Sequence, residues 1–188
     1  MKYIDLSVPI NQSTPVYPGD LKIEFTAGGV LEKDGYLDYR VCIGTHVGTH
    51  IDAPAHMVKN GKNLDEFPIE NFIGDGVYVE IKGRFSLEAI KNAGIKEGDI
   101  VLFHTGMSDM FDKVEYFVER GVKMVGMDMC SPDYEPYAVH KILLGNNILI
   151  AENLTNLAQL KGKKFKVFAL PLKLQVDGAP TRVIASIF

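Results

Sequence analysis

Hydrophobic and polar residues alternate with period two in several short stretches of the chain, and this pattern predicts β-strands. The stretches that alternate, or that form a short apolar run between turn residues, are 3–8, 21–26, 36–43, 77–82, 99–104, 148–151, 165–170 and 182–187. A Gly-Asp-Gly sequence at positions 74–76 favours a break just before the fourth of them.

Three other stretches carry helix signals. In residues 86–94, Ser86 is a suitable N-cap, Glu88 lies in the first turn and Gly94 ends the helix. Further helices are predicted around residues 108–120 and over 136–144, the last with Pro136 near its start and Gly145 after its end. Strands interspersed with helices predict an α/β fold with a mixed, barrel-like β-sheet flanked by helices.

Composition limits the classes of protein to be considered. The 188 residues are 46% hydrophobic and contain neither a repeat nor a linker-like stretch, so we expect a single domain over residues 1–188. A net charge of −4 argues against nucleic acid as a partner. Asp5 and Pro9 interrupt any signal-peptide pattern, and no stretch approaches the ~20 apolar residues of a membrane span. We therefore expect a cytoplasmic protein that does not enter the membrane.

Candidate chemistry is concentrated in the segment His46–His56, which contains three of the five histidines of the chain together with Asp52. Imidazole and carboxylate groups are the ligands of Zn²⁺, Mn²⁺ and Fe²⁺ in catalytic sites. In one straight strand His46 and His50 would lie about 13 Å apart, too far for one ion. Gly48 and Pro54 oppose a helix, so we expect a bent loop. The alternative is a polar turn whose histidines bond only backbone groups.

The sequence HVGTHIDAPAH at 46–56 resembles the His-x-Gly-Thr-His-x-Asp-x-Pro-x-His signature of the putative cyclase family, whose best-known members are the bacterial kynurenine formamidases. Similar pieces extend over nearly the whole chain. They lie at 5–7, 15–20, 105–106, 125–128, 143–147, 152–154 and 178–182. The resemblance implies a fold of the swivelling β/β/α type.

The resemblance also implies roles for individual residues. It gives five metal ligands, which are His46, His50, Asp52, His140 and Glu152. It implies one or two divalent ions per chain, with Zn²⁺ expected first and Mn²⁺ second, and an aspartate that bridges two ions where both are present. His56 corresponds to the catalytic acid/base of the family. Homodimers or larger homo-oligomers are also implied.

Several of these residues have simpler explanations when taken alone. His140 could be a surface histidine of a helix, and Glu152 a carboxylate at a helix N-terminus. Tyr17 resembles an aromatic residue near the substrate pocket of the family, but it could equally pack on the core. His104 is either a structural histidine or a substrate contact. Cys42 and Cys130 do not form a metal-binding pattern and are expected to be buried thiols.

We hypothesise from these residues a metal-dependent hydrolase of a small molecule. Metal-bound hydroxide would attack a formamide, cyclic amide or lactone carbonyl, and His56 would shuttle the proton to the leaving group. This activity would be arylformamidase-like. The competing hypotheses are a metal-binding or regulatory module of the same fold without turnover, and a purely structural protein.

Overall fold

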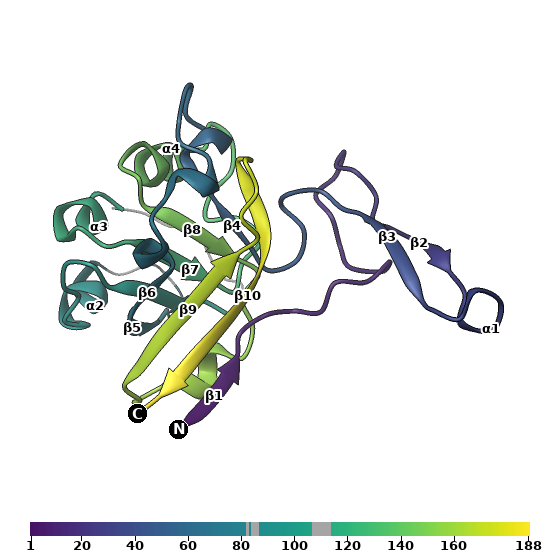
Figure 1. Ribbon diagram of the computed structural model, residues 1–188. Helices are drawn as coiled ribbons and strands as arrows, with labels where there is room; N and C mark the ends of the chain where they lie inside the picture. The colour runs from purple at the N-terminus through teal and green to yellow at the C-terminus, as the bar shows by residue number, and fades with distance from the viewer. Residues whose placement is uncertain (82, 84–86, 107–113) are drawn as a thin grey trace.

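The computed structural model describes residues 1–81, 83, 87–106 and 114–188 (Figure 1). The described strands are β1 (Lys2–Asp5), β2 (Glu24–Gly29), β3 (Asp38–Cys42), β4 (His50–Asp52), β5 (Ile73–Glu80), β6 (Ile100–His104), β7 (Met124–Met127), β8 (Leu149–Glu152), β9 (Phe165–Pro171) and β10 (Gly178–Ile187). The described α-helices are α1 (Leu31–Asp34), α2 (Leu87–Asn92), α3 (Glu115–Arg120) and α4 (Ala138–Gly145). Short 3-10 helices are η1 (Pro54–His56), η2 (Leu64–Glu66), η3 (Ile69–Phe72) and η4 (Leu157–Leu160).

Strands β5, β6, β7 and β8 are parallel neighbours in that order. The chain passes through α2, α3 and α4 between them, and these helices cover the same side of the sheet (Figure 1). The sheet continues in the order β8-β4-β10, and β10 also pairs with β9, which pairs with β5. The ring thereby closes, and β1 adds to β10 outside it. The predicted α/β fold with a mixed, barrel-like sheet is confirmed.

Hydrophobic side chains fill two layers on either side of the barrel wall. In β6, Ile100 and Leu102 belong to one buried cluster with residues of β9 and β10, while Val101 and Phe103 belong to a second cluster with the helices. Both faces of β6 are therefore buried, which explains why its sequence is a continuous apolar run. Phe103 packs edge-on against Phe117 of α3, with ring centroids 5.5 Å apart.

The glycines at 74 and 76 do not break the chain, so that prediction was wrong. Both lie within β5, which begins at Ile73. A Cβ atom on Gly76 would lie 2.0 Å from the ring of Phe165 in the neighbouring strand β9. Gly76 is therefore needed for close packing within the barrel, a role that the sequence pattern does not distinguish from a turn.

Helix boundaries differ from the predicted ones where the backbone turns. Helix α4 begins at Ala138 after Tyr137, which has a φ of 58°, and Gly145 is its last residue. Pro136 therefore precedes the helix, and Gly145 does not follow it. The first residue of the predicted helix 86–94 and the first six residues of the one around 108–120 lie outside the described part of the chain. Within that part, none of the helices is long and apolar enough to cross a membrane.

The hairpin β2–β3, with α1 at its tip, projects away from the barrel (Figure 1). Its strands pair Phe25 with Val41 and Ala27 with Tyr39, and these side chains share one face. Tyr39 is 51% exposed and Val41 is 48% exposed. We call residues 24–42 the arm; its apolar face is only half covered by its own chain.

Candidate metal centre and cavity

The segment from His46 to His56 combines a turn, a strand and a 3-10 helix, so the predicted bent loop is only partly right. Gly48, at a φ of 61°, turns the chain after His46. Residues His50–Asp52 then form β4, inserted between β8 and β10. Pro54 starts η1, which ends at His56. The two bends at Gly48 and Pro54 bring residues from both ends of the segment to one place.

Strand β4 places two of the candidate ligands by simple alternation. Ile51 points into the hydrophobic cluster of β9 and β10, so His50 and Asp52 point to the opposite face. His50 is the register partner of Glu152, the last residue of β8. His140 of α4 reaches the same position from the helix layer, and its Nε2 lies 3.4 Å from Glu152 Oε1.

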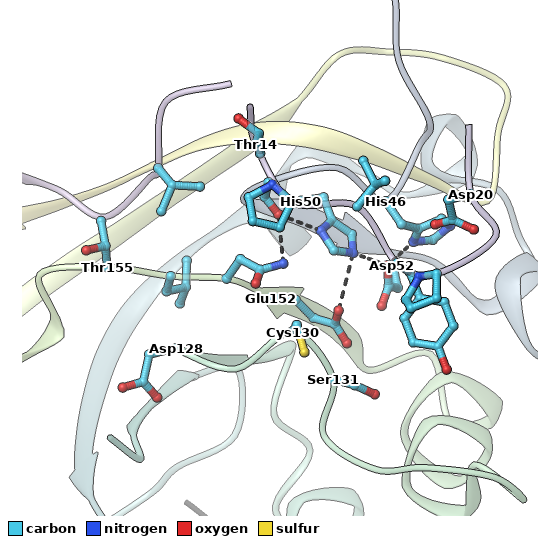
Figure 2. A pocket seen from close by; sticks show the side chains of 18 of the residues that line it. Thr14, Asp20, His46, His50, Asp52, Asp128, Cys130, Ser131, Glu152 and Thr155 are labelled. Atoms are coloured by element: carbon cyan, nitrogen blue, oxygen red, sulfur yellow. Dashed lines mark hydrogen bonds and ion pairs between the residues drawn. The ribbon is translucent and has the colours of Figure 1, made fainter. Parts of the chain in front are cut away.

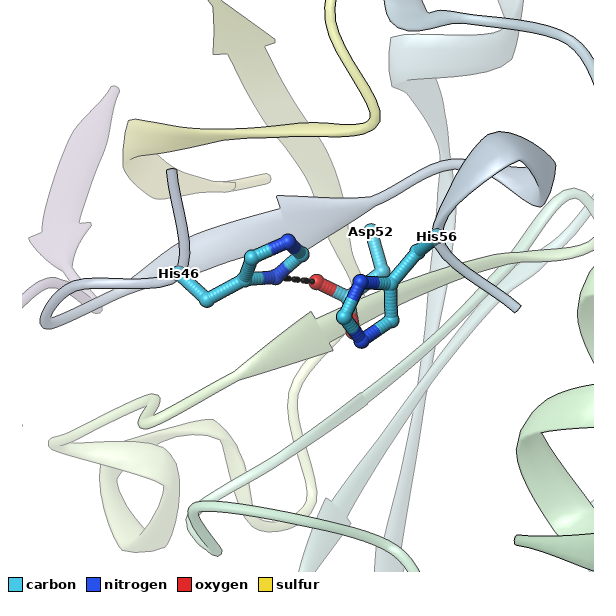
Figure 3. Close-up of side chains that lie close together, drawn as sticks. All are labelled: His46, Asp52 and His56. Carbon is cyan, nitrogen blue, oxygen red and sulfur yellow. Dashed lines mark hydrogen bonds and ion pairs between the residues drawn. The ribbon is translucent and has the colours of Figure 1, made fainter. Parts of the chain in front are cut away.

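Asp52 is at the centre of the cluster (Figures 2 and 3). Its Oδ1 lies 2.6 Å from His46 Nδ1 and 3.3 Å from His50 Nε2, and its Oδ2 lies 3.9 Å from His140 Nε2. His50 Nε2 is 3.4 Å from Glu152 Oε2. All five residues predicted as metal ligands thus converge, with Asp52 between the histidines.

Each of the three histidines that contact Asp52 is fixed by a partner on its other ring nitrogen. His50 Nδ1 lies 2.8 Å from the carbonyl oxygen of Gly48, and His140 Nδ1 bonds Asp133. His46 Nε2 lies 2.9 Å from Asp177 Oδ2. Such outer partners fix the tautomer and orientation of a metal-binding imidazole. The remaining nitrogen of each ring points at the carboxylates of the cluster.

Charge in the cluster is balanced between imidazoles and buried carboxylates. Burial disfavours the charged form of His50, but the facing Asp52 and Glu152 raise its pKa well above the ordinary value. Burial likewise opposes the charged forms of His46 and His140, but Asp52 and Asp177 raise the pKa of His46, and Glu152 and Asp133 raise the pKa of His140. Burial also opposes ionisation of Asp52, yet His50 and His46 lower its pKa. The folded cluster therefore favours protonated imidazoles next to ionised carboxylates.

This donor set fits a divalent cation. Glu152 Oε1 is buried and makes no hydrogen bond within the described part of the chain, although buried carboxylate oxygens are normally satisfied. Ligand atoms of His50, Asp52 and Glu152 lie within 4.8 Å of one another, and so do those of His46, Asp52 and His56. Asp52 is the carboxylate that both groups share.

His56 lies beside His46, with the ring centroids 4.0 Å apart (Figure 3). Its Nδ1 is 3.2 Å from Asp177 Oδ2, the same oxygen that contacts His46. The pKa of Asp177 is lowered by these two histidines despite partial burial, which acts in the other direction. His56 thus adjoins the metal cluster without contacting Glu152 or His50 in the described structure.

The cluster lines a cavity of about 870 Å³ (Figure 2). His46, His50, Asp52, His56, His140 and Glu152 all face it. Tyr17 also lines the cavity and is 55% exposed, so it is not packed in the core. His104 is not among the lining residues; its Nδ1 lies 2.9 Å from Tyr78 Oη. Cys130 is exposed and lines the cavity, contrary to the expectation of a buried thiol.

Asp177 and Asp133 belong to the site but were missed from the sequence. Asp177 directly precedes the 178–182 segment, so its neighbourhood offered a signal. Asp133 lies seven residues before His140, on the other side of the turn at Tyr137, and no local periodicity connects them. Both are brought in by the tertiary fold.

Metal removal is expected to lower the thermal stability, and more so at higher pH. Histidines whose pKa is raised by folding stabilise the metal-free protein below their unfolded pKa, and this contribution is lost as the pH rises through the folded pKa. Metal binding instead requires the unprotonated rings. At a metal concentration of about 1,000 times Kd, binding adds about 4 kcal/mol to the free energy of unfolding, which corresponds to roughly 10 °C in Tm.

The measurement is a set of melting curves at pH 6, 7 and 8, with Zn²⁺ or with a chelator. The gain in Tm should grow over this range. A gain that is constant or decreases with pH would contradict the assignment of histidine ligands.

The fold and cluster together define an α/β barrel with a candidate metal centre of histidine and carboxylate ligands. The sequence profile of the family described as "Putative cyclase" matches residues 4–134. The chain belongs to this family.

Two curated relatives align over most of their length. An uncharacterised protein of Methanocaldococcus jannaschii is 35% identical, covering 90% of this chain and 91% of the relative. The kynurenine formamidase of Bacillus cereus is 26% identical, covering 97% of this chain and 96% of the relative.

Solved structures share the architecture. A "predicted metal-dependent hydrolase from Bacillus stearothermophilus" has a TM-score of 0.78 and 28% identity, covering 98% of this chain and 97% of the other. Isatin hydrolase A from Labrenzia aggregata superposes with a TM-score of 0.83 at 24% identity, and the match covers 98% of this chain and 93% of the isatin hydrolase. At 24% identity, the similarity to isatin hydrolase A shows a shared fold and nothing more.

Proposed function

We propose that this protein is a metal-dependent hydrolase of a formamide, cyclic amide or lactone, with kynurenine formamidase-like activity. The observation that carries the proposal is the convergence of five ligand side chains and His56 on one cavity. The kynurenine formamidase relative and the metal-dependent hydrolase neighbour support the reaction class.

His46, His50, Asp52, His140 and Glu152 would hold the metal, with Zn²⁺ proposed first and Mn²⁺ second. When bound, a divalent ion lowers the pKa of water from 15.7 toward roughly 7 and polarises a carbonyl group. The carboxylates and the outer hydrogen bonds keep the ligand nitrogens aimed at one place. His56 faces the cavity beside His46 and Asp52 and apart from the group of His50 and Glu152, and from this place it would move a proton between water and the leaving group.

The test is a turnover assay of metal-loaded protein against N-formylkynurenine, formanilide, isatin and a simple lactone. Each assay is paired with a chelator-treated sample and with a metal analysis. Hydrolysis that requires the metal supports the proposal. Stoichiometric metal without turnover of any of these substrates would instead identify a non-catalytic metal-binding module.

We also propose that the protein assembles as a homodimer through the arm. A two-stranded hairpin is marginally stable by itself, and here one face carries half-exposed apolar side chains. Leu37, which directly precedes β3, is also exposed, at 61%. A second copy of the chain supplies a matching surface because a two-fold interface uses the same patch on both partners.

Introducing charge on the apolar face of the arm is expected to weaken the assembly. Tyr39→Lys combined with Val41→Lys removes two apolar side chains from this face and should raise the dimer Kd at least about 100-fold. Glu24→Lys changes the net charge by the same two units on the opposite face of the hairpin and serves as the matched control. Mass measurement by light scattering over a dilution series tests this. Equal masses for both variants would count against the arm as the interface.

A further inference from the structure

Asp177 is the residue through which His46 and His56 are connected. Its carboxylate oxygen Oδ2 lies 2.9 Å from His46 Nε2 and 3.2 Å from His56 Nδ1. Its side chain is 36% exposed, and its position is set by the backbone of β10 and the loop before it. One oxygen thus accepts hydrogen bonds from two imidazoles with different roles.

The backbone around Asp177 is held firmly at the site. Ala53 N donates to the carbonyl oxygen of Asp177, and Leu64 N donates to that of Val176, at 2.8 and 3.0 Å. Gly178 follows and pairs with Asp52 across the strands. A Cβ atom on Gly178 would lie 2.6 Å from His46 Cε1, so the glycine makes room for that ring. The Asp-Gly pair therefore places a carboxylate next to both imidazoles without displacing either.

We infer that Asp177 is a positioning residue that fixes the tautomer and orientation of His56 for proton transfer, an inference that rests on the proposed function. A carboxylate that accepts a hydrogen bond from Nδ1–H leaves Nε2 unprotonated, and this is the atom able to accept a proton from water or substrate. The same arrangement of carboxylate and imidazole orients the general base of serine hydrolases.

Contact with His46 gives Asp177 a second, competing role. In this competing role, Asp177 orients only the metal ligand His46, in the way that Asp133 orients His140. The two roles differ in one respect. If Asp177 acts through His56, replacing Asp177 lowers kcat no further in protein that already lacks His56. If Asp177 acts through His46, replacing it lowers kcat equally in both backgrounds.

The first experiment is a double-mutant cycle on the Zn²⁺-loaded protein, with Asp177→Asn, His56→Ala and the pair. We expect Asp177→Asn alone to lower kcat about 10- to 100-fold with KM nearly unchanged. In the His56→Ala background it should have no further effect. An equal loss in both backgrounds would overturn the inference. Asp75→Asn makes the same change at a surface carboxylate of β5 and is the matched control.

The second experiment does not depend on turnover. Long-range ¹⁵N–¹H NMR spectra report which ring nitrogen carries the proton, and the His56 signals are identified by their absence in His56→Ala. We expect the Nδ1–H tautomer in the wild-type protein and a mixture in Asp177→Asn. An unchanged tautomer would overturn the inference. If no substrate is hydrolysed, the proposed function fails, while this measurement still decides the role of Asp177.

Discussion

Replacing Asp52 with asparagine is expected to remove the metal and to abolish turnover. Asp52 is 1% exposed and faces His46, His50 and His140, so it contributes to every part of the cluster. An amide offers one neutral oxygen in place of a charged pair of oxygens, and its NH₂ group cannot coordinate. A loss of about 4 kcal/mol of transition-state stabilisation corresponds to about 10³-fold in rate.

The Asp52→Asn experiment needs three measurements on purified protein: metal content by mass spectrometry, kcat/KM with excess Zn²⁺, and Tm. Asp20→Asn is the matched control, because Asp20 lines the same cavity outside the cluster. The control should bind metal as the wild-type protein does. An Asp52→Asn protein with full metal and undiminished kcat/KM would refute the assignment of this cluster as the metal centre.

His56→Ala is expected to separate metal binding from catalysis. His56 lies next to His46, and no ion pair in the described part of the chain joins it to Glu152, so the metal should remain bound. Loss of a positioned proton-transfer group lowers rates about 10²- to 10⁴-fold. We therefore expect near-normal metal content, a KM close to that of the wild-type protein, and a large decrease in kcat.

The His56→Ala result is checked by metal analysis and steady-state kinetics on the same samples. His104→Gln is a suitable control, since His104 bonds Tyr78 and does not line the cavity. If His56→Ala lost its metal instead, the group of His46, Asp52 and His56 would describe a second ion site. Full turnover with full metal would exclude His56 from the reaction.

The sequence identified the central part of the site because its signal is local. His46, His50, Asp52 and His56 lie within eleven residues, and their spacing around Gly48 and Pro54 indicated a bent segment. The short strand within it was not foreseen, because β4 exists through pairing with β8 and β10 rather than through its own pattern. The alternating stretches and the short apolar runs together likewise located most barrel strands.

What sequence patterns missed depends on contacts between distant residues. The sequence pattern around Gly76 indicates a turn, but Gly76 packs against Phe165, 89 residues later in the chain. The sequence pattern around Asp177 indicates only a loop, but Asp177 is hydrogen-bonded to His46 and His56, more than 120 residues earlier in the chain. Hydrophobic periodicity carries no information on strand order, so neither the closure of the ring nor these partners could be derived from it.

The insertion of β4 between β8 and β10 has a consequence for how the protein reaches its native state. The pairing of His50 with Glu152 and of Asp52 with Gly178 joins β8 to β10 through β4, and each pair links residues more than 100 positions apart in the chain. Contacts between such distant parts of a chain are expected to form late in folding, because loop closure must precede them. We therefore expect metal binding to appear late in refolding, when β4 joins β8 to β10.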